Sequence, residues 1–442
     1  MSATEPSTNP DALLPRALGT PELAAGIFNY TVGSGIFVLP AVVVAALGSA
    51  APLAYLTCAV LIVLVVLCLA EAGSRVAATG GPYAYVDAGL GSLAGCIAGV
   101  LLFLTGLAGA AAVSTAFAAS LKALLGVSAP WFDSVVIVAV FAVLGGINVR
   151  GVRTGARLVE AATVAKLLPL LAFVIIGAFF IDPSRLRWTE TPSAAAILQS
   201  SGVLIFAFCG IESALIPSGE VRSPARTVPL AAFIAIGAAT AFYLSIQFVA
   251  QGVLGTALAD DRVTPLATAA ATFAGSTGRT VMIVGATLSM FGYLTFAALA
   301  GPRSLFAFAR DGLLPRGLAA VHERYHTPWI AIIVYCTAGV ALAQTGTFES
   351  LAVLANLSAI LLYAMCAVSA WLLRRRGVRL EQEPFVTPGG PLIPILTLAG
   401  LAWLFKETAG REHLVPGAAV LAAVVVLYGI RALRSKPSAV SA

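Results

Sequence analysis

Long apolar runs recur along nearly the whole chain and leave it few possible folds. A helix that spans a bilayer needs about 20 predominantly apolar residues, and about twelve runs reach that length. Only 10% of the residues are charged, against about 25% in soluble domains, and the mean hydropathy is +0.96. Strand-length alternation of apolar and polar residues is absent, which argues against a membrane barrel. The sequence therefore predicts an all-α polytopic membrane protein.

The segments between the runs indicate how the chain lies in the membrane. The predicted spans are residues 22–48, 52–76, 92–125, 131–147, 157–181, 194–218, 228–254, 279–309, 328–345, 349–373, 391–407 and 413–433. Residues 1–21 and 434–442 are predicted tails, and the first of these lacks the pattern of a signal peptide. With the N-terminus inside, 18 of the 26 Lys and Arg residues fall on the inner side and 7 on the outer side. This asymmetry predicts that both termini are cytoplasmic, and it explains the net charge of +6 without nucleic-acid binding. The expected location is the plasma membrane.

Two spans carry interruptions at matching places. The first breaks at "VGSGIF" (32–37) and the sixth at "FAFCGIES" (206–213). The odd offset of five spans gives the two halves opposite orientations, as in an inverted repeat of residues 22–181 and 194–373, followed by two more helices in 391–433. Small residues also allow close helix packing. However, paired glycine-interrupted segments in two halves are a strong pointer to a transporter binding site.

The groups that these breaks release suit a zwitterion. The N–H groups around residues 33–35 meet the positive end of the following half-helix, which favours a carboxylate. The carbonyls of Thr31, Phe206 and Cys209 are candidates to accept an ammonium group. A site that binds a carboxylate at one end and an ammonium group at the other suits an α-amino acid.

Two ionisable residues lie within the predicted spans. Lys166 is about 12 Å of helix rise into its span, too deep for easy snorkelling. It is interpreted as a fixed or titrating cation beside the broken first helix, with a snorkelling lysine near the inner interface as the alternative. Glu212 follows the sixth break and is interpreted equally as a proton carrier or as an anchor for neighbouring polar backbone.

No motif predicts a cofactor, a metal site or an enzyme. The "GSG" of the first break lacks the strand–turn–helix context of a dinucleotide site, and no Walker motif appears. His322 and His326 have helical spacing but no second ligand pair, and Pro328 follows them. The spans contain no nucleophile–base pair.

Along nearly its whole length the chain resembles the amino acid–polyamine–organocation (APC) superfamily of transporters. The matching stretches, in order, are "GSGIF", "GGPYAYV", "GVRTGARLVEAATVAKLLPLL", "FAFCGIESALIPSGEVRSPARTVP" and "RSLFAFARDGLLP". The resemblance implies a LeuT-like five-plus-five inverted repeat with broken helices 1 and 6, two additional C-terminal helices, and alternating access.

The resemblance also implies roles for particular residues. Residues 33–35 match the carboxylate-binding loop, and Phe206 matches an aromatic that closes over the substrate. Lys166 resembles the lysine that replaces a sodium ion in proton-coupled or sodium-independent members. Glu212 matches a carboxylate linked to proton sensing in arginine–agmatine exchangers, which lack the lysine. The predicted substrate-binding residues are Thr31, Gly33, Ser34, Gly35, Phe206, Cys209, Gly210 and Tyr293, and the predicted coupling or gating residues are Lys166, Glu212 and Phe206.

The third span, "LLFLTGLAGAAAVSTAF", is small and apolar and offers no acid to a cationic side chain. Burying an unpaired cation there would be costly, so we expect a neutral, hydrophobic or small amino acid. A cationic substrate stays open as an alternative, with Glu212 as the nearby acid to support it. The expected function is sodium-independent, proton-coupled uptake. Exchange of amino acids, or of an amino acid for its amine, stays open as an alternative, and so does an amino-acid sensor. The expected partners are the lipid bilayer, the amino acid and coupling protons, and no feature predicts the oligomeric state.

Overall fold

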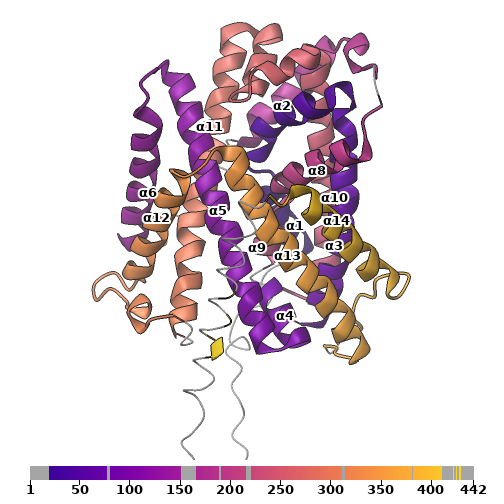
Figure 1. Cartoon of the computed structure of the whole chain (residues 1–442), viewed down its shortest axis with the longest axis vertical. Coiled ribbons are helices and arrows are strands. Elements are labelled where there is room, and N and C mark those ends of the chain that lie inside the picture. Colours follow the sequence, from indigo (N-terminus) through magenta and orange to yellow (C-terminus); the bar gives the residue numbers. More distant parts are fainter. Residues whose placement is uncertain are drawn as a thin grey trace, which may run out of the picture.

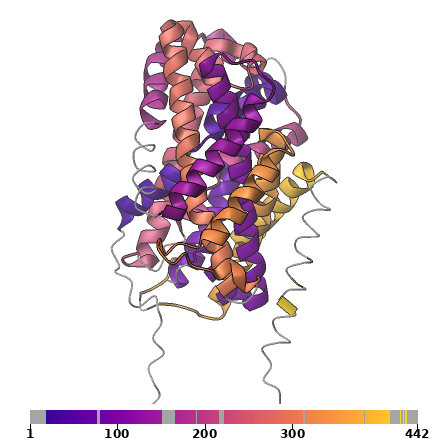
Figure 2. The same ribbon diagram turned by 90° about the vertical axis from the view of Figure 1, so that its left-hand side faces the viewer.

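The computed structural model describes residues 19–76, 80–150, 166–188, 191–215, 221–310, 314–380, 382–410, 422, 425, 428 and 429. These residues form an elongated bundle of helices, most of which run along its long axis (Figures 1 and 2). Most of the predicted N-terminal tail, the start of the fifth span, nearly all of the last span and the C-terminal tail lie outside the described residues.

The described helices cover eleven of the predicted spans, and one further helix lies between two of those spans. They are α1 (Thr20–Thr31), α2 (Gly35–Leu47), α3 (Ala51–Arg75), α4 (Pro82–Leu90), α5 (Ser92–Leu125), α6 (Phe132–Arg150), the helix Lys166–Phe180, α8 (Ala194–Phe208), α9 (Ile211–Ala214), α10 (Pro224–Leu254), α11 (Pro265–Arg310), α12 (Trp329–Ala343), α13 (Phe348–Arg375) and α14 (Leu392–Thr408). Within the described part, six helical stretches are long and apolar enough to cross a membrane, and three shorter apolar helices accompany them. The prediction of a polytopic helical membrane protein is confirmed at this level.

Two helical segments differ from the predicted spans. Helix α4 was not predicted, although Pro82 at its first turn and Gly91 after its end are typical boundary residues. Helix α11 begins 14 residues before the predicted span 279–309. Its first part is separated from the rest by Gly275, whose backbone is not helical (φ 61°, ψ −153°). The apolar span therefore starts after a short preceding helix.

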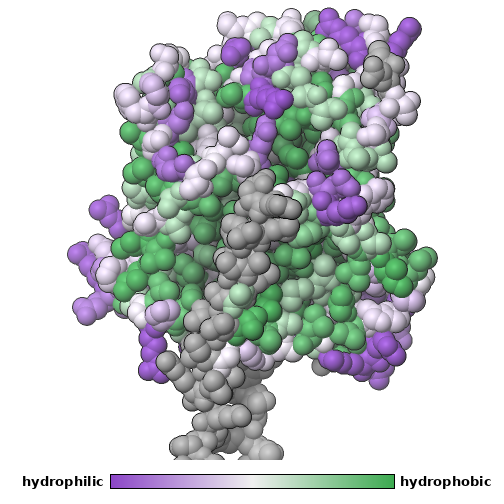
Figure 3. All heavy atoms as spheres, in the orientation of Figure 1, coloured by the Kyte–Doolittle hydropathy of each residue, from purple (hydrophilic) through white to green (hydrophobic). Residues whose placement is uncertain are grey.

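The bundle has a buried core of small and apolar side chains and an apolar outer surface. Helix α5 packs against α4, α11 and α13, while α10 packs against α1 and α3. Large apolar side chains such as Val60, Leu168 and Ile175 are more than 60% exposed. Hydrophobic residues cover much of the middle of the molecule in Figure 3, and hydrophilic ones gather mainly toward its ends. An exposed apolar surface of this extent suits contact with lipid rather than water.

The two predicted interruptions are present, and they lie against each other. Helix α1 ends at Thr31 and α2 begins at Gly35, while α8 ends at Phe208 and α9 begins at Ile211. Gly210 has φ +130°, a conformation that side chains rarely allow. A Cβ atom on Gly210 would lie 2.8 Å from the carbonyl carbon and oxygen of Tyr30, so the backbones of the two breaks are in direct contact.

Candidate substrate-binding site

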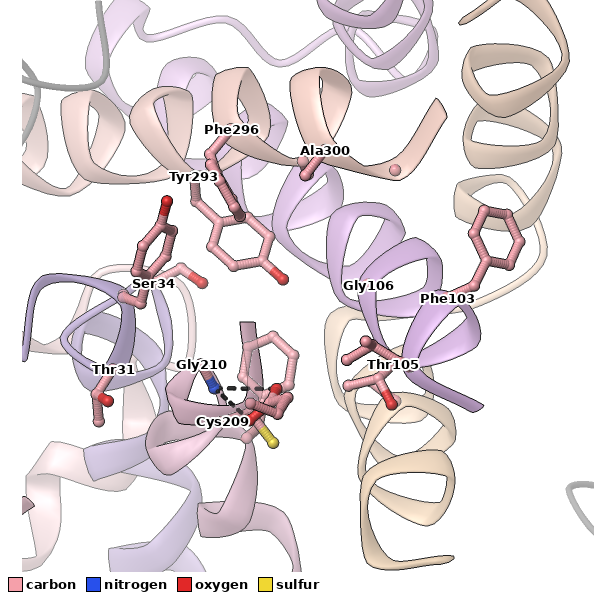
Figure 4. Close-up of a pocket in the computed structure, with 18 of the residues that line it drawn as sticks. Thr31, Ser34, Phe103, Thr105, Gly106, Cys209, Gly210, Tyr293, Phe296 and Ala300 are labelled. Atoms are coloured by element: carbon pink, nitrogen blue, oxygen red, sulfur yellow. Dashed lines mark hydrogen bonds between the residues drawn. The ribbon is translucent and has the colours of Figure 1, made fainter. Parts of the chain in front are cut away.

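A cavity of about 90 Å³ lies beside the two interruptions (Figure 4). All eight predicted substrate-binding residues line it: Thr31, Gly33, Ser34, Gly35, Phe206, Cys209, Gly210 and Tyr293. Glu212 lines it as well. The opposite walls come mainly from α5, with Leu102, Phe103, Thr105 and Gly106, and from α11, with Phe296, Ala297, Ala300, Gly301 and Ser304. The fold thus brings together residues from both halves of the chain.

The first interruption presents backbone donors at the start of α2. The Phe37 N–H is the first N–H of α2 with a hydrogen bond inside this turn: it donates to the Ser34 carbonyl at 3.1 Å. The N–H groups of Ser34, Gly35 and Ile36 precede it and therefore have no partner within the helix. The Gly33 N–H instead donates to the Thr31 carbonyl at 2.8 Å. The N–H groups that suit a carboxylate are therefore those of Ser34, Gly35 and Ile36. This set begins one residue later than the predicted set, which began at Gly33.

The second interruption is held by Glu212. The Gly210 N–H donates to both carboxylate oxygens of Glu212, at 3.1 and 3.0 Å, and not to Phe206 as a continued helix would require. The Phe206 carbonyl thereby loses its helical donor. The Tyr363 hydroxyl donates to the same carboxylate at 2.7 Å. This geometry matches the interpretation of Glu212 as an anchor for polar backbone.

The Thr31 carbonyl, predicted to be available to an ammonium group, is already occupied in this structure. The Tyr243 hydroxyl lies 2.6 Å from the Thr31 carbonyl oxygen and 2.7 Å from that of Ala207. Tyr243 is fully buried in α10. Its single hydroxyl therefore connects the two interrupted segments. An ammonium group would have to share the Thr31 carbonyl oxygen with Tyr243 or displace it, and the binding role of Thr31 stays a prediction.

We expect Tyr243→Phe to lower transport about tenfold, because hydrogen bonds that hold the two breaks together would be lost. The matched control is Tyr55→Phe, since the buried Tyr55 hydroxyl has no hydrogen-bond partner. Initial uptake rates and melting temperatures of the two variants check this expectation. Equal uptake by both variants would contradict the bridging role.

Aromatic rings close the cavity on two sides. Phe206 packs edge-to-face against Phe348 at the start of α13, with ring centroids 5.4 Å apart. Tyr30 packs in the same manner against Phe296, at 4.4 Å. The hydroxyl of Tyr293 reaches α5, where it lies 2.5 Å from the Cβ position of Gly109. The sequence predicted Phe206 and Tyr293 here but gave no signal for Tyr30 or Phe296.

Lys166 lies behind the first interruption and is not among the residues that line the cavity. Its ammonium group donates to the Asn29 carbonyl at 2.7 Å, and the residue is 7% exposed. Asn29 is in the last turn of α1, where carbonyls lack helical donors and a positive charge is favourable. Lys166 therefore links the helix Lys166–Phe180 to the end of α1, next to the broken helix as predicted.

Replacing Lys166 with alanine should lower transport by about tenfold or more, because a charge-assisted hydrogen bond at the end of α1 is removed. Lys122→Ala serves as the comparison, since Lys122 pairs with Asp133 in a partly exposed ion pair distant in sequence from both breaks. Uptake measured across a range of pH values tests this. Full, pH-independent transport by Lys166→Ala would remove the lysine from the mechanism.

The chain is similar to known membrane transporters along nearly its whole length. Residues 18–429 match the amino acid permease family. Over 432 residues the chain is 30% identical to the uncharacterized transporter Rv1999c of Mycobacterium tuberculosis, covering 97% of this chain and 93% of the relative. It is 28% identical over 422 residues to the serine/threonine exchanger SteT of Bacillus subtilis, covering 92% and 94%. It is 24% identical over 417 residues to the branched-chain amino acid permease BcaP of Bacillus subtilis, covering 90% and 88%.

Proposed function

We propose that this chain, which belongs to the amino acid permease family and is an amino acid transporter, carries a small neutral amino acid across the cell membrane by alternating access. The two interrupted helices hold the zwitterion near mid-membrane while the bundle switches between outward- and inward-facing states. In this proposal residues 22–181 and 194–373 form the two inverted repeats, residues 391–433 form the last two helices, and both termini are cytoplasmic.

The preference for a neutral substrate rests on the surroundings of Glu212, the one acid among the described residues that line the cavity. Glu212 already accepts hydrogen bonds from the Gly210 N–H and from the Tyr363 hydroxyl. The remaining lining residues are apolar, aromatic, small or hydroxyl-bearing. A guanidinium or ammonium side chain would therefore have to displace these partners to pair with Glu212, and no other acid among the described lining residues could balance its charge, so burying it would be costly. A neutral side chain avoids this cost.

The size of the cavity supports a small substrate. A cavity of about 90 Å³ leaves more room for alanine, serine or threonine than for an amino acid with a long or aromatic side chain. The name of the relative SteT, a serine/threonine exchanger, points to the same size class.

Lys166 supports a coupling mode that does not use sodium. Its ammonium group is buried beside the end of α1, so a positive charge is already present behind the first interruption. A second cation at that place would meet electrostatic repulsion at low effective dielectric. On this basis we propose sodium-independent uptake, coupled to protons through Lys166 or Glu212, with amino acid exchange, the activity in SteT's name, as the alternative.

Purified protein in sodium-free proteoliposomes tests the proposal. Labelled alanine, serine, threonine, leucine and arginine are supplied with and without an inward proton gradient, to vesicles that are empty or preloaded with amino acid. We expect gradient-driven uptake of the small neutral substrates into empty vesicles. Uptake restricted to preloaded vesicles would replace symport by exchange, and binding without either flux would contradict transport.

Gly106 offers a test of substrate size. It lines the cavity on α5, and a Cβ atom placed there meets nothing within 4 Å. Gly106→Ala should therefore fold normally while it removes room for one methyl group. We expect KM for threonine to rise about tenfold, with a smaller change for alanine, in uptake assays of the two substrates. A uniform change for both would show that Gly106 does not face the side chain of the substrate.

A further inference from the structure

A second hollow, with a volume of about 530 Å³, lies between α6 and α12. These two helices pack together at the edge of the bundle in Figure 1. They approach closely at Gly145 and Gly339, where a Cβ would lie 3.0 Å from the Cys336 sulfur and 2.7 Å from the Phe141 ring. Beside Gly146, by contrast, a Cβ would meet nothing within 4 Å. The hollow is therefore a groove along one side of the helix pair.

The groove opens on the apolar outer surface of the bundle. Its floor is formed by buried side chains such as Phe141 and Ile332, and Ile333 on its rim is 50% exposed. Val143 on α6 and Val334 on α12, which are also exposed, continue the same surface. A groove bordered in this way faces lipid in a membrane protein, so its occupant there has to be apolar.

One end of the groove is polar and basic. Arg150, the last residue of α6, and Tyr325 line this end. The loop that carries Tyr325 is fixed to α6, because the Thr327 hydroxyl donates to the Val149 carbonyl at 2.7 Å. The Arg324 guanidinium lies 5.5 Å from the centre of the Tyr325 ring. Among the described residues no carboxylate forms an ion pair with Arg150.

We propose that this groove binds one anionic phospholipid, with an acyl chain along the apolar floor and the phosphate on Arg150. The shape supplies an apolar channel that leads to a positive charge and a phenol hydroxyl, which is the chemistry of a lipid tail and its phosphate head group. A zwitterionic lipid fits the channel but brings an ammonium group toward the arginine, so the charge of the groove favours the anionic lipid.

The test counts lipid adducts on delipidated protein by native mass spectrometry, using phosphatidylglycerol and phosphatidylcholine with identical acyl chains. We expect the wild-type protein to retain one phosphatidylglycerol about fivefold more tightly than phosphatidylcholine. Arg150→Gln should abolish that preference and Arg150→Lys should keep most of it. Gly146→Leu, which fills the open part of the groove, should reduce retention of both lipids. Arg279→Gln, at an exposed arginine elsewhere, is the matched control.

Equal retention of the two lipids by the wild-type protein would overturn the proposal. So would wild-type retention in both Arg150→Gln and Gly146→Leu. A dimer mass that disappears in Gly146→Leu would assign the groove to a second copy of the chain and would also overturn it. Melting temperatures of all variants confirm that altered retention does not come from unfolding.

Discussion

Gly210→Ala is expected to abolish amino acid transport. Gly210 has φ +130°, and a Cβ atom there would lie 2.8 Å from the carbonyl carbon and oxygen of Tyr30. The clash is with backbone, so no side-chain rotation relieves it, and the φ value itself costs about 1–3 kcal/mol for a residue with a side chain. The two interrupted segments have to separate, which destroys the cavity between them.

The matched control is Gly26→Ala in α1, where an added Cβ meets nothing within 4 Å. Both variants are purified, checked for a single peak in gel filtration, and then assayed for substrate binding and uptake. We expect Gly26→Ala to behave as the wild type and Gly210→Ala to lose binding at least a hundredfold. Wild-type binding by monodisperse Gly210→Ala would mean that contact between the two breaks is not needed for the site.

Glu71→Ala is expected to lower the free energy of unfolding more than any other variant named above. The Glu71 carboxylate, with a side chain only 3% exposed, lies 2.9 Å from the Arg75 guanidinium and 3.7 Å from that of Arg374. It also accepts the Thr387 N–H at 3.1 Å. Arg75 in turn donates to the Val378 carbonyl at 2.9 Å. One carboxylate thus joins α3, the end of α13 and the segment that leads to α14.

Removing Glu71 leaves the buried Arg75 without its counter-charge, which costs about 3–5 kcal/mol. The control is Glu349→Ala, because the Arg262–Glu349 pair has a distance of 3.5 Å and side chains that are 56% and 42% exposed. That change should cost no more than about 1 kcal/mol. Thermal unfolding in detergent measures both, and similar melting temperatures for the two variants would show that the buried network contributes little.

The sequence predicted the parts of the fold that depend on local composition. Each apolar run within the described residues became a helix because backbone groups in hydrocarbon must bond within the segment. The first break was visible because Gly33, Ser34 and Gly35 stand together, and the second because Gly210 follows a long apolar run. Helix α4 was missed because its nine residues are too few for a membrane span, which was the pattern searched for. Pro82 in its first turn would have indicated the start of a helix.

The hydrogen bonds that hold the site together were not visible in the sequence. Tyr243 and Tyr363 are single tyrosines within apolar helices, and a single tyrosine has no periodic pattern to mark it. Their partners Thr31 and Glu212 lie 212 and 151 residues away, so only the folded chain brings them together. For the same reason the hydrogen bond between Tyr243 and the Thr31 carbonyl was not predicted.

In the proposed mechanism, backbone groups of the two interruptions bind both charged poles of the amino acid. The most direct test is competition for bound labelled serine by serine itself, by serine methyl ester, which lacks the carboxylate, and by 3-hydroxypropionate, which lacks the ammonium group. We predict that each analogue competes about a hundredfold more weakly than serine, because each loses charge-assisted hydrogen bonds. Displacement by either analogue as effectively as by serine would show that the two interruptions do not bind both charged groups.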